Sequence, residues 1–314
     1  MKIIDLKNDK CVKKIQEPLC LLLGNFDGVH EGHTRLIDVA LEEGRDLGIK
    51  VAVWTFAEHP LNVMGKGVPT LSSNEEKNSL FAEKGIDYVI YEDFAKVKNT
   101  EPADFINNIL IGQFDCRAVV CGFNFKFGKN GGGKPDLLLE EMKKQNRRVA
   151  IVPPVYRMDK VVSSTEIRTY LENGDVENAA IMLGRPYSIE LPVEYGNAVG
   201  RTLGLPTINQ HFPKNRIKPC AGSYACKCYV GQKEYYGVAN VGSRPTVNSD
   251  KSDINCETHI IGFNGWIYGE KVKVEFYKKL RDERRFDNVS ELKSAIESDK
   301  EETVRYFESV NKRI

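Results

Sequence analysis

The stretch Leu19-Cys-Leu-Leu-Leu23, followed at once by Gly24-Asn-Phe-Asp-Gly-Val-His-Glu-Gly-His33, decides the fold of the first half of this chain. The continuous apolar run is typical of a parallel strand that is covered on both faces. Apolar residues at helical spacing follow the second stretch, which therefore lies between a strand and a helix. In an open parallel sheet, ligands bind beyond the carboxyl ends of the strands. Residues 24–33 therefore predict a ligand site at such an end.

Residues 24–33 also have the chemistry of a phosphate site. Free N–H groups and the positive end of the dipole make a helix N-terminus favourable for an anion. Histidines in place of a P-loop lysine suit chemistry at an α-phosphate, with pyrophosphate as the leaving group. A zinc site is disfavoured because no third and fourth ligand follow at nearby spacing, whereas two histidines that only cap the helix stay an alternative. The candidate residues are Gly24, Phe26, Asp27, Gly28, His30 and His33.

The rest of the first half alternates short apolar runs with helical patterns. We expect further strands at 51–56, 87–91, 118–121 and 149–152, and helices near 74–84, 101–111 and 136–147. Such alternation predicts an α/β domain with a Rossmann-like, doubly wound parallel sheet that has helices on both faces. Two helical pieces follow, and a Gly-Arg-Pro break after them predicts one domain over 1–185 and a second over 186–314.

Two more segments of the first half suit nucleotide or flavin binding. Asn124 lies in an aromatic segment after a predicted strand, where its amide and the neighbouring rings can hold a planar ring. An ordinary aromatic turn is the alternative there. Ser163, Ser164 and Thr165 begin a predicted helix, with Arg168 one turn further on. They offer hydroxyls and a guanidinium to a phosphate, although a helix that is merely capped by hydroxyls explains the same residues equally well.

The second half has a different sequence pattern, in which many short strand-like runs are separated by Gly, Pro and Asn. These runs lie at 223–230, 234–241, 256–263 and 271–280. Together they predict an antiparallel β-barrel. One amphipathic helix is expected near 290–310, at the end of the chain.

A second set of candidate residues lies within these runs and before them. Gly200 and Gly204 suit a loop that closes over phosphates, and the Thr207 hydroxyl beside Asn209 can ligate Mg²⁺. Glu257 lies among apolar residues of a strand-like run, so its carboxylate is either paired or functional. The alternative for Gly200 and Gly204 is a glycine-rich turn of the barrel. The alternative for Glu257 is an exposed position on a strand.

Composition limits the class of protein. The chain has 314 residues, of which 41% are apolar, and its 45 basic and 44 acidic residues give a net charge of +1. This balance argues against a polybasic nucleic-acid-binding protein. No apolar run approaches the ~18 residues that span a bilayer. The eight cysteines form no C-x-x-C pair, so we expect reduced thiols, a cytoplasmic location, and no nucleic-acid or membrane partner.

Taken together, the motifs resemble one known family. Residues 24–33, 122–128 and 163–168 resemble the FMN adenylyltransferase module of bacterial bifunctional riboflavin kinase/FAD synthetases, whose signature is H-x-G-H. Residues 185–209, 242–246 and 257–263 resemble the riboflavin kinase module of the same family, and its pattern continues to residue 286. The resemblance implies that the barrel has six strands, binds flavin and is followed by a C-terminal helix.

The resemblance also implies two reactions. Riboflavin would take the γ-phosphate of ATP to give FMN, and FMN would take AMP from a second ATP to give FAD and pyrophosphate, with Mg²⁺ at both sites. Glu257 is the candidate base of the first reaction. His30, His33, Ser164 and Arg168 are the candidates for charge stabilisation in the second. The implied binding residues of the kinase module are Gly200, Arg201, Gly204, Pro206, Asn209, Arg244 and Arg281, with Thr207 for Mg²⁺.

Other interpretations stay open at this point. One alternative is that one of the two modules is inactive, which leaves an adenylyltransferase or a kinase alone. A flavin-sensing protein without turnover is a rival from another class, although His30, His33 and Glu257 are all present. We expect a monomer or a weak homo-oligomer.

Overall fold

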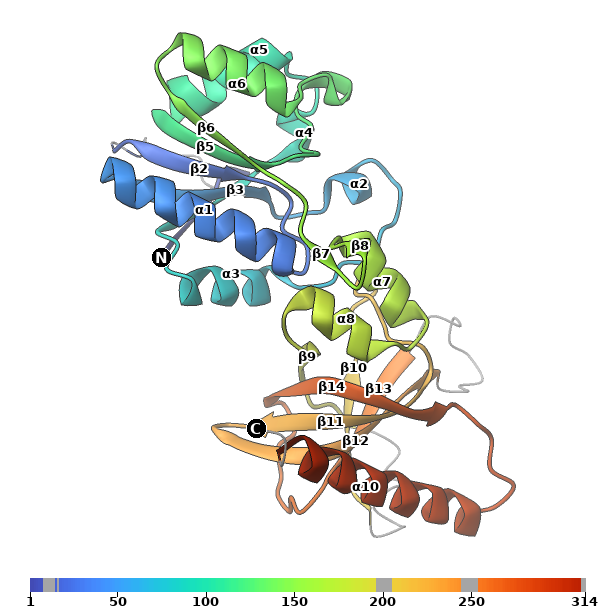
Figure 1. The fold of residues 1–314 in the computed structure, drawn as a ribbon. Coiled ribbons are helices and arrows are strands. Elements are labelled where there is room, and N and C mark those ends of the chain that lie inside the picture. Colours follow the sequence, from blue (N-terminus) through green and yellow to red (C-terminus); the bar gives the residue numbers. More distant parts are fainter. Residues whose placement is uncertain (8–14, 16, 196–204, 244–253, 312–314) are drawn as a thin grey trace. The chain divides into compact units, whose positions relative to one another are not determined.

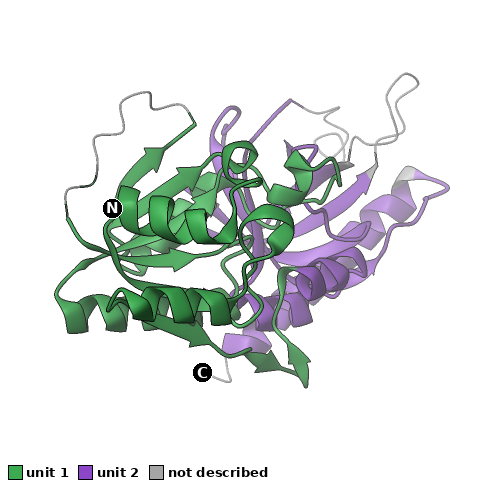
Figure 2. Ribbon diagram, turned by 90° about the horizontal axis from the view of Figure 1, so that it is seen from above, with its two compact units in different colours: residues 1–164 green, residues 165–314 purple. Residues whose placement is uncertain are grey.

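The computed structural model describes residues 1–7, 15, 17–195, 205–243 and 254–311. The chain divides into two compact units, Met1–Ser164 and Thr165–Ile314 (Figure 2). Each unit has its own sheet and its own buried core. The units are therefore described separately.

The first unit is built on a parallel sheet of six strands. Their order across the sheet is β1-β4-β3-β2-β5-β6. The apolar run that decides the fold is β2, and all five of its side chains are buried, as a central strand covered on both faces requires. The predicted doubly wound parallel sheet is thereby confirmed. The strands are β1 (Lys2–Asp5), β2 (Leu19–Leu23), β3 (Lys50–Phe56), β4 (Tyr88–Glu92), β5 (Cys116–Gly122) and β6 (Arg148–Val152).

Helices cover both faces of this sheet. The helix α1 (Glu31–Leu47) and α3 (Asn74–Glu83) pack on one face, and α6 (Pro135–Lys144) packs on the other (Figure 1). The helix predicted near 101–111 consists of a short α-helix and a π-helical segment. The remaining helical elements are α2 (Pro60–Val63), α4 (Phe94–Val97), α5 (Pro102–Asp104), η1 (Phe105–Gln113) and η2 (Lys129–Gly131).

Two strand features of the first unit give no clear signal in the sequence. One is the edge strand β1, which is only four residues long and half exposed. The other is the hairpin of β7 (Tyr156–Arg157) and β8 (Lys160–Val161), whose turn residues Met158 and Asp159 have φ of 51° and 60°. Such turns usually contain Asn-Gly or Asp-Gly, and a Met-Asp pair does not indicate one.

In its described residues, the second unit has an antiparallel sheet of six strands and the helices α7, α8 and α10. The order across the sheet is β10-β13-β12-β11-β14-β9. The helix α7 (Ser164–Glu172) begins at the last residue of the first unit. Asp175 caps α8 by accepting the Asn178 N–H at 3.1 Å. The other elements are α8 (Val176–Leu183), β9 (Tyr187–Pro192), β10 (Thr207–His211), β11 (Gly222–Val230), β12 (Lys233–Ser243), β13 (Ile254–Ile260), β14 (Lys271–Asp282) and α10 (Val289–Asn311).

The sheet of the second unit curls so that its two edges meet. A β-bridge joins Glu194, just after β9, to Asn209 of β10. The buried Gln210 side chain donates to the carbonyls of Leu191 and Val272 at 2.7 and 2.8 Å. The bridge and the bond to Leu191 link the first strand of the sheet to the last, which confirms the predicted six-stranded barrel. The helix α10 packs along β11 and β12, where the Phe307 ring stacks on Tyr236 at 4.5 Å.

Candidate active sites

A cavity of about 790 Å³ lies at the carboxyl ends of β2, β3 and β5 in the first unit. Its volume is in the range of small-molecule sites. Gly24, His33 and Asn124 are among the residues that line it, as their positions after these strands predict. Much of the remaining wall is aromatic, and its rings are Trp54, Phe56, Phe94, Phe105, Phe125 and Phe127. The cavity therefore offers apolar ring faces beside a helix N-terminus.

His30 and His33 form a reciprocal cap at the start of α1. The His33 N–H donates to Nδ1 of His30 at 3.3 Å, and the His30 N–H donates to Nδ1 of His33 at 3.4 Å. The two rings stack with their centroids 3.6 Å apart. Because each Nδ1 accepts a hydrogen bond, the proton of each neutral imidazole is on Nε2. The capping role and the donor role are thus compatible, since the cap selects the tautomer that can donate to a phosphate.

The loop before α1 has an unusual backbone. Phe26, Gly28 and Val29 have φ of 52°, 83° and 40°. For residues other than glycine this conformation costs roughly 1–3 kcal/mol each, and it persists only where neighbours hold it. Here the Asp27 carboxylate accepts the Leu71 N–H at 2.8 Å, which ties the loop to the segment before α3.

Two serines add further bonds to this loop. The Gly28 N–H donates to the Ser72 hydroxyl at 3.0 Å, and the Ser164 hydroxyl donates to the Asp27 carbonyl at 2.9 Å. The Phe26 side chain is fully buried against the rings of Phe81 and His33. In this structure Phe26, Asp27 and Ser164 therefore shape the loop that presents the histidines.

The residues predicted to bind phosphate at the start of α7 are divided between the two units. Ser163 and Ser164 end the first unit, and Thr165 and Arg168 belong to the second. On α7 the Thr165 side chain is exposed and Arg168 is half-buried. A role of Thr165 and Arg168 in phosphate binding stays a prediction.

A buried lysine beneath the loop was not expected from the sequence. Lys77 of α3 is only 5% exposed, and its Nζ lies 3.5 Å from the Phe56 carbonyl and 5.5 Å from the centre of the Tyr91 ring. Burial lowers the pKa of Lys77 to about 8, although the negative charge of Asp27 opposes this shift. Polar neighbours on both sides in the sequence, Glu76 and Asn78, conceal its burial.

Removing this charge should stabilise the first unit. The pKa of Lys77 is lowered from 10.5 to about 8 in the folded protein, so between these pH values the unfolded state binds more protons than the folded state. The free energy of unfolding therefore decreases as the pH falls through this range. We expect Lys77→Met to raise the free energy of unfolding by about 3 kcal/mol at pH 7, and the difference should shrink as the pH approaches 10.5.

Fluorescence of the buried Trp54 during denaturation reports on this unit. Lys84→Met, at the exposed end of the same helix, is the matched control and should change stability by less than about 0.5 kcal/mol. A Lys77→Met variant that is less stable than the parent at pH 7 would contradict the expectation.

In the second unit, strand register brings the predicted kinase residues into one row. Asn209 of β10 lies opposite Glu257 of β13, and Glu257 lies opposite Asn240 of β12. Asn240 is paired with Ser223 of β11, which in turn is paired with Arg281 of β14. Residues directly opposite each other in an antiparallel sheet point to the same face. One face of the sheet therefore carries a polar row across five strands, with Glu257 between two amides.

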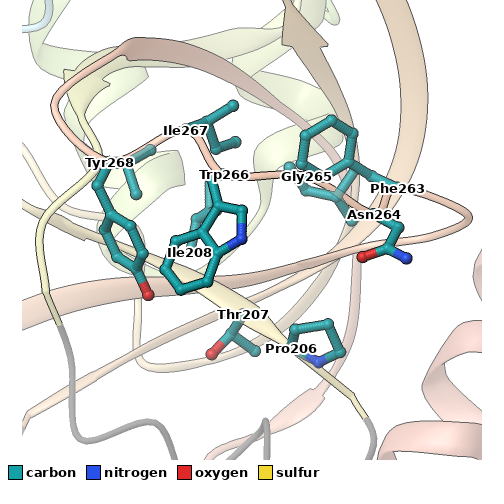
Figure 3. Close-up of a pocket in the computed structure, with 11 residues that line it drawn as sticks. Pro206, Thr207, Ile208, Phe263, Asn264, Gly265, Trp266, Ile267 and Tyr268 are labelled. Carbon is teal, nitrogen blue, oxygen red and sulfur yellow. The ribbon is translucent and has the colours of Figure 1, made fainter.

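A cavity of about 360 Å³ lies at the start of β10. Pro206 and Thr207 line one side of it, and Thr207 lies two residues before Asn209 on the same face of β10. On the other side, Trp266 and Tyr268 project from the loop after β13 (Figure 3). Tyr195 stacks on Tyr268 at 4.2 Å, which extends the aromatic rim.

Arg281 is held in place by the C-terminal helix. Its Nε and Nη2 donate to the Asp299 carboxylate of α10 at 3.0 and 2.8 Å, and the Ser223 hydroxyl donates to the same carboxylate at 2.9 Å. Asp299 is 5% exposed, so this pair anchors α10 at one end of the polar row. The predicted role of Arg281 in ligand binding is untested, but its guanidinium has this structural role.

The donor set near the row suits a hard cation. The Thr207 hydroxyl, the Asn209 amide and the Glu257 carboxylate are oxygen donors on one face of adjacent strands. Magnesium binds few protein oxygens and relies on substrate phosphates for the rest. Among the described residues there is no cluster of three or more His, Cys, Asp or Glu side chains that could hold a metal ion. Gly200, Arg201, Gly204 and Arg244 lie outside the described residues.

Comparison with known proteins assigns a family to each half of the chain. A family model described as FAD synthetase matches residues 12–166, and one described as riboflavin kinase matches residues 183–307. The predicted boundary at 185/186 lies just inside the second match. The compact units divide after the first residue of α7, between Ser164 and Thr165.

A solved structure and a search for membrane spans give further context. The structure, described as a macrolide-efflux protein from Streptococcus pneumoniae, has a TM-score of 0.84 at 28% identity and covers 96% of this chain and 98% of its own. No helix among the described residues is long and apolar enough to cross a membrane.

Curated relatives match along nearly the whole chain. The bifunctional riboflavin kinase/FMN adenylyltransferase of Bacillus subtilis is 35% identical, with 96% of each chain covered. The protein of the same description from Escherichia coli K12 is 33% identical, with 95% of each chain covered. With both family models in the expected order, these relatives show that the chain belongs to the family of bifunctional riboflavin kinases/FMN adenylyltransferases.

Proposed function

We propose that the two reactions of this enzyme take place at two separate sites, one centred on the histidine pair of the first unit and the other on the polar row of the second. The enzyme phosphorylates riboflavin to FMN and adenylylates FMN to FAD, using ATP in both reactions. The FAD synthetase match covers most of the first unit, and the riboflavin kinase match lies within the second. The histidine pair therefore belongs to FAD synthesis and the polar row of the barrel to riboflavin phosphorylation.

In the kinase site, the row containing Glu257 carries the proposal. The Glu257 carboxylate accepts the proton of the ribityl 5′-hydroxyl as that oxygen bonds to the γ-phosphorus. The bond between the γ-phosphorus and the β,γ-bridging oxygen breaks, and ADP leaves with its electrons. Asn209 and Asn240 stand on either side of the carboxylate on the same face and orient it. Thr207 and Asn209 would hold Mg²⁺, which when bound neutralises charge on the phosphates.

In the adenylyltransferase site, the stacked histidines carry the proposal. The phosphate of FMN is already an anion, so no base is needed to activate it. Its oxygen attacks the α-phosphorus of ATP, and pyrophosphate leaves with the electrons of the broken P–O bond. His30 and His33 present Nε2–H donors to the negative charge that develops, and the loop held by Asp27 and Ser164 fixes their position. Ser163, Thr165 and Arg168 are proposed to bind phosphate oxygens as well.

The proposed metal role of Thr207 predicts a change in magnesium dependence. In Thr207→Ala, the Mg²⁺ concentration that half-saturates riboflavin phosphorylation should rise at least about tenfold, because a ligand of the metal is lost. Thr207→Ser keeps the hydroxyl and should stay near the parent. Conversion of supplied FMN to FAD is the internal control and should not change. An unchanged magnesium curve in the Ala variant would contradict this assignment.

We further propose that the enzyme acts in the cytoplasm, as a monomer or a weak homo-oligomer. All seven cysteines in the described part of the chain are free thiols, and six of them are buried. Cys226 and Cys228 share one face of β11, as their spacing predicts, with their sulfur atoms 3.8 Å apart. Unpaired thiols at this separation support a reducing compartment.

A further inference from the structure

A buried histidine of the barrel has no part in the scheme above. His259 of β13 is 8% exposed and lies directly opposite Thr207 of β10. It is two residues after Glu257, so both side chains are on the same face of the strand. On its other side the register places Val238 of β12. The imidazole therefore lies next to the proposed metal-binding threonine.

The His259 ring contacts the backbone that leads into Thr207. Its Nδ1 is 3.0 Å from the carbonyl oxygen of Pro206. A carbonyl can only accept, so the proton of the ring is on Nδ1 and the histidine is the donor. The pyrrolidine ring already fixes φ of Pro206. With its carbonyl held as well, the peptide between Pro206 and Thr207 has a defined orientation.

This orientation decides where the threonine side chain stands. The plane of the peptide before Thr207, together with the extended φ of Thr207 in β10, fixes its Cα–Cβ bond. A β-branched side chain then has few rotamers. Pro206 and Thr207 both line the cavity of about 360 Å³ at the start of β10 (Figure 3). A shift of the Pro206 carbonyl would therefore displace the Thr207 hydroxyl from the position in which it meets the metal-bound nucleotide.

We propose that His259 is a positioning residue of the kinase site, which holds the Pro206 carbonyl so that the Thr207 hydroxyl is preorganised for Mg–ATP. The inference rests on the proposed role of Thr207 as a magnesium ligand. It does not depend on any change in the protonation of His259. The hydrogen bond from His259 to the Pro206 carbonyl affects nucleotide binding. It does not affect riboflavin binding or the adenylyltransferase reaction.

Three substitutions in the full-length chain test the inference. Asn places an amide donor close to the position of Nδ1, Gln places it further out, and Ala removes it. His259→Ala and His259→Gln should each raise the KM for Mg–ATP in riboflavin phosphorylation about tenfold, the effect of losing one hydrogen bond. His259→Asn should restore the KM to within about threefold of the parent. The KM for riboflavin and the rate of FMN conversion to FAD should not change.

A merely structural role would give a different pattern. Loss of folded protein lowers kcat and leaves both KM values unchanged, and a general distortion of the barrel raises both KM values together. Either pattern overturns the inference, as does an Asn variant that is no better than Gln. If His259→Ala does not fold, the KM values for Mg–ATP of His259→Asn and His259→Gln still test the inference. Thermal unfolding shows whether these two variants are folded.

The Thr207→Ala variant separates the two hypotheses. If it shifts the magnesium dependence while the histidine variants leave the KM for Mg–ATP unchanged, the role of Thr207 stands and that of His259 is wrong. If Thr207→Ala leaves the magnesium dependence unchanged, the proposed role of Thr207 fails and the inference on His259 fails with it.

Discussion

Glu257→Gln should slow riboflavin phosphorylation by ~10²-fold, the lower end of the usual contribution of a general base. Glutamine keeps the shape of the side chain and removes its basicity. The lower end is expected because phosphoryl transfer through a loose transition state needs little proton removal early on. Glu257 is half-buried between Asn209 and Asn240, which can hydrogen-bond glutamine as well, so the change should leave the barrel intact.

Two controls make this result specific. FMN supplied directly to Glu257→Gln should become FAD at the rate of the parent, because that reaction uses the other unit. Asn240→Ala removes one flanking amide and keeps the base, so it should cost less than Glu257→Gln. A Gln variant that phosphorylates riboflavin within about threefold of the parent would mean that Glu257 only positions the ribityl chain.

His30→Ala should lower the conversion of FMN to FAD by ~10²–10³-fold, the effect of losing one donor to charge in the transition state. Riboflavin phosphorylation should not change. The measurement is the initial rate of FAD formation from FMN, ATP and Mg²⁺. Because His30 also caps α1, the Ala variant should lose about 1 kcal/mol of stability as well.

A serine at this position separates the two roles of His30. Serine is a strong N-cap residue, so His30→Ser should recover the stability lost in His30→Ala. It has no Nε2–H that reaches the phosphate, so FAD synthesis should stay low. If His30→Ser restores FAD synthesis, or if His30→Ala lowers it less than about tenfold, His30 is a helix cap and not a catalytic donor.

Strong local patterns made the central elements predictable. The run Leu19–Leu23 has no polar residue, so only a strand buried on both faces fits it, and the glycines and histidines after it had to lie at the carboxyl end of the sheet. In the barrel, the chemistry of Thr207, Asn209 and Glu257 and their resemblance to one family indicate a site. That they share a face follows from the register of β10 and β13, which the sequence by itself does not specify.

Long-range packing explains what the sequence did not reveal. The bond from Asp27 to Leu71 joins residues far apart in the chain, and the burial of Lys77 depends on how α3 lies against β4. The ion pair between Arg281 and Asp299 likewise depends on where α10 packs. The strands β9 and β10 were not predicted either, because prolines stand at their ends or beside them, and proline usually argues against a strand.

The flavin products formed from riboflavin, ATP and Mg²⁺ test the central claim, that one chain carries two independent active sites. The assay compares Glu257→Gln, His30→Ala and an equal mixture of the two. We expect Glu257→Gln to leave riboflavin largely unconverted but to make FAD when FMN is supplied. His30→Ala should accumulate FMN, and the mixture should form FAD from riboflavin. The account is contradicted if either variant loses both reactions, because the two sites would then not be separate.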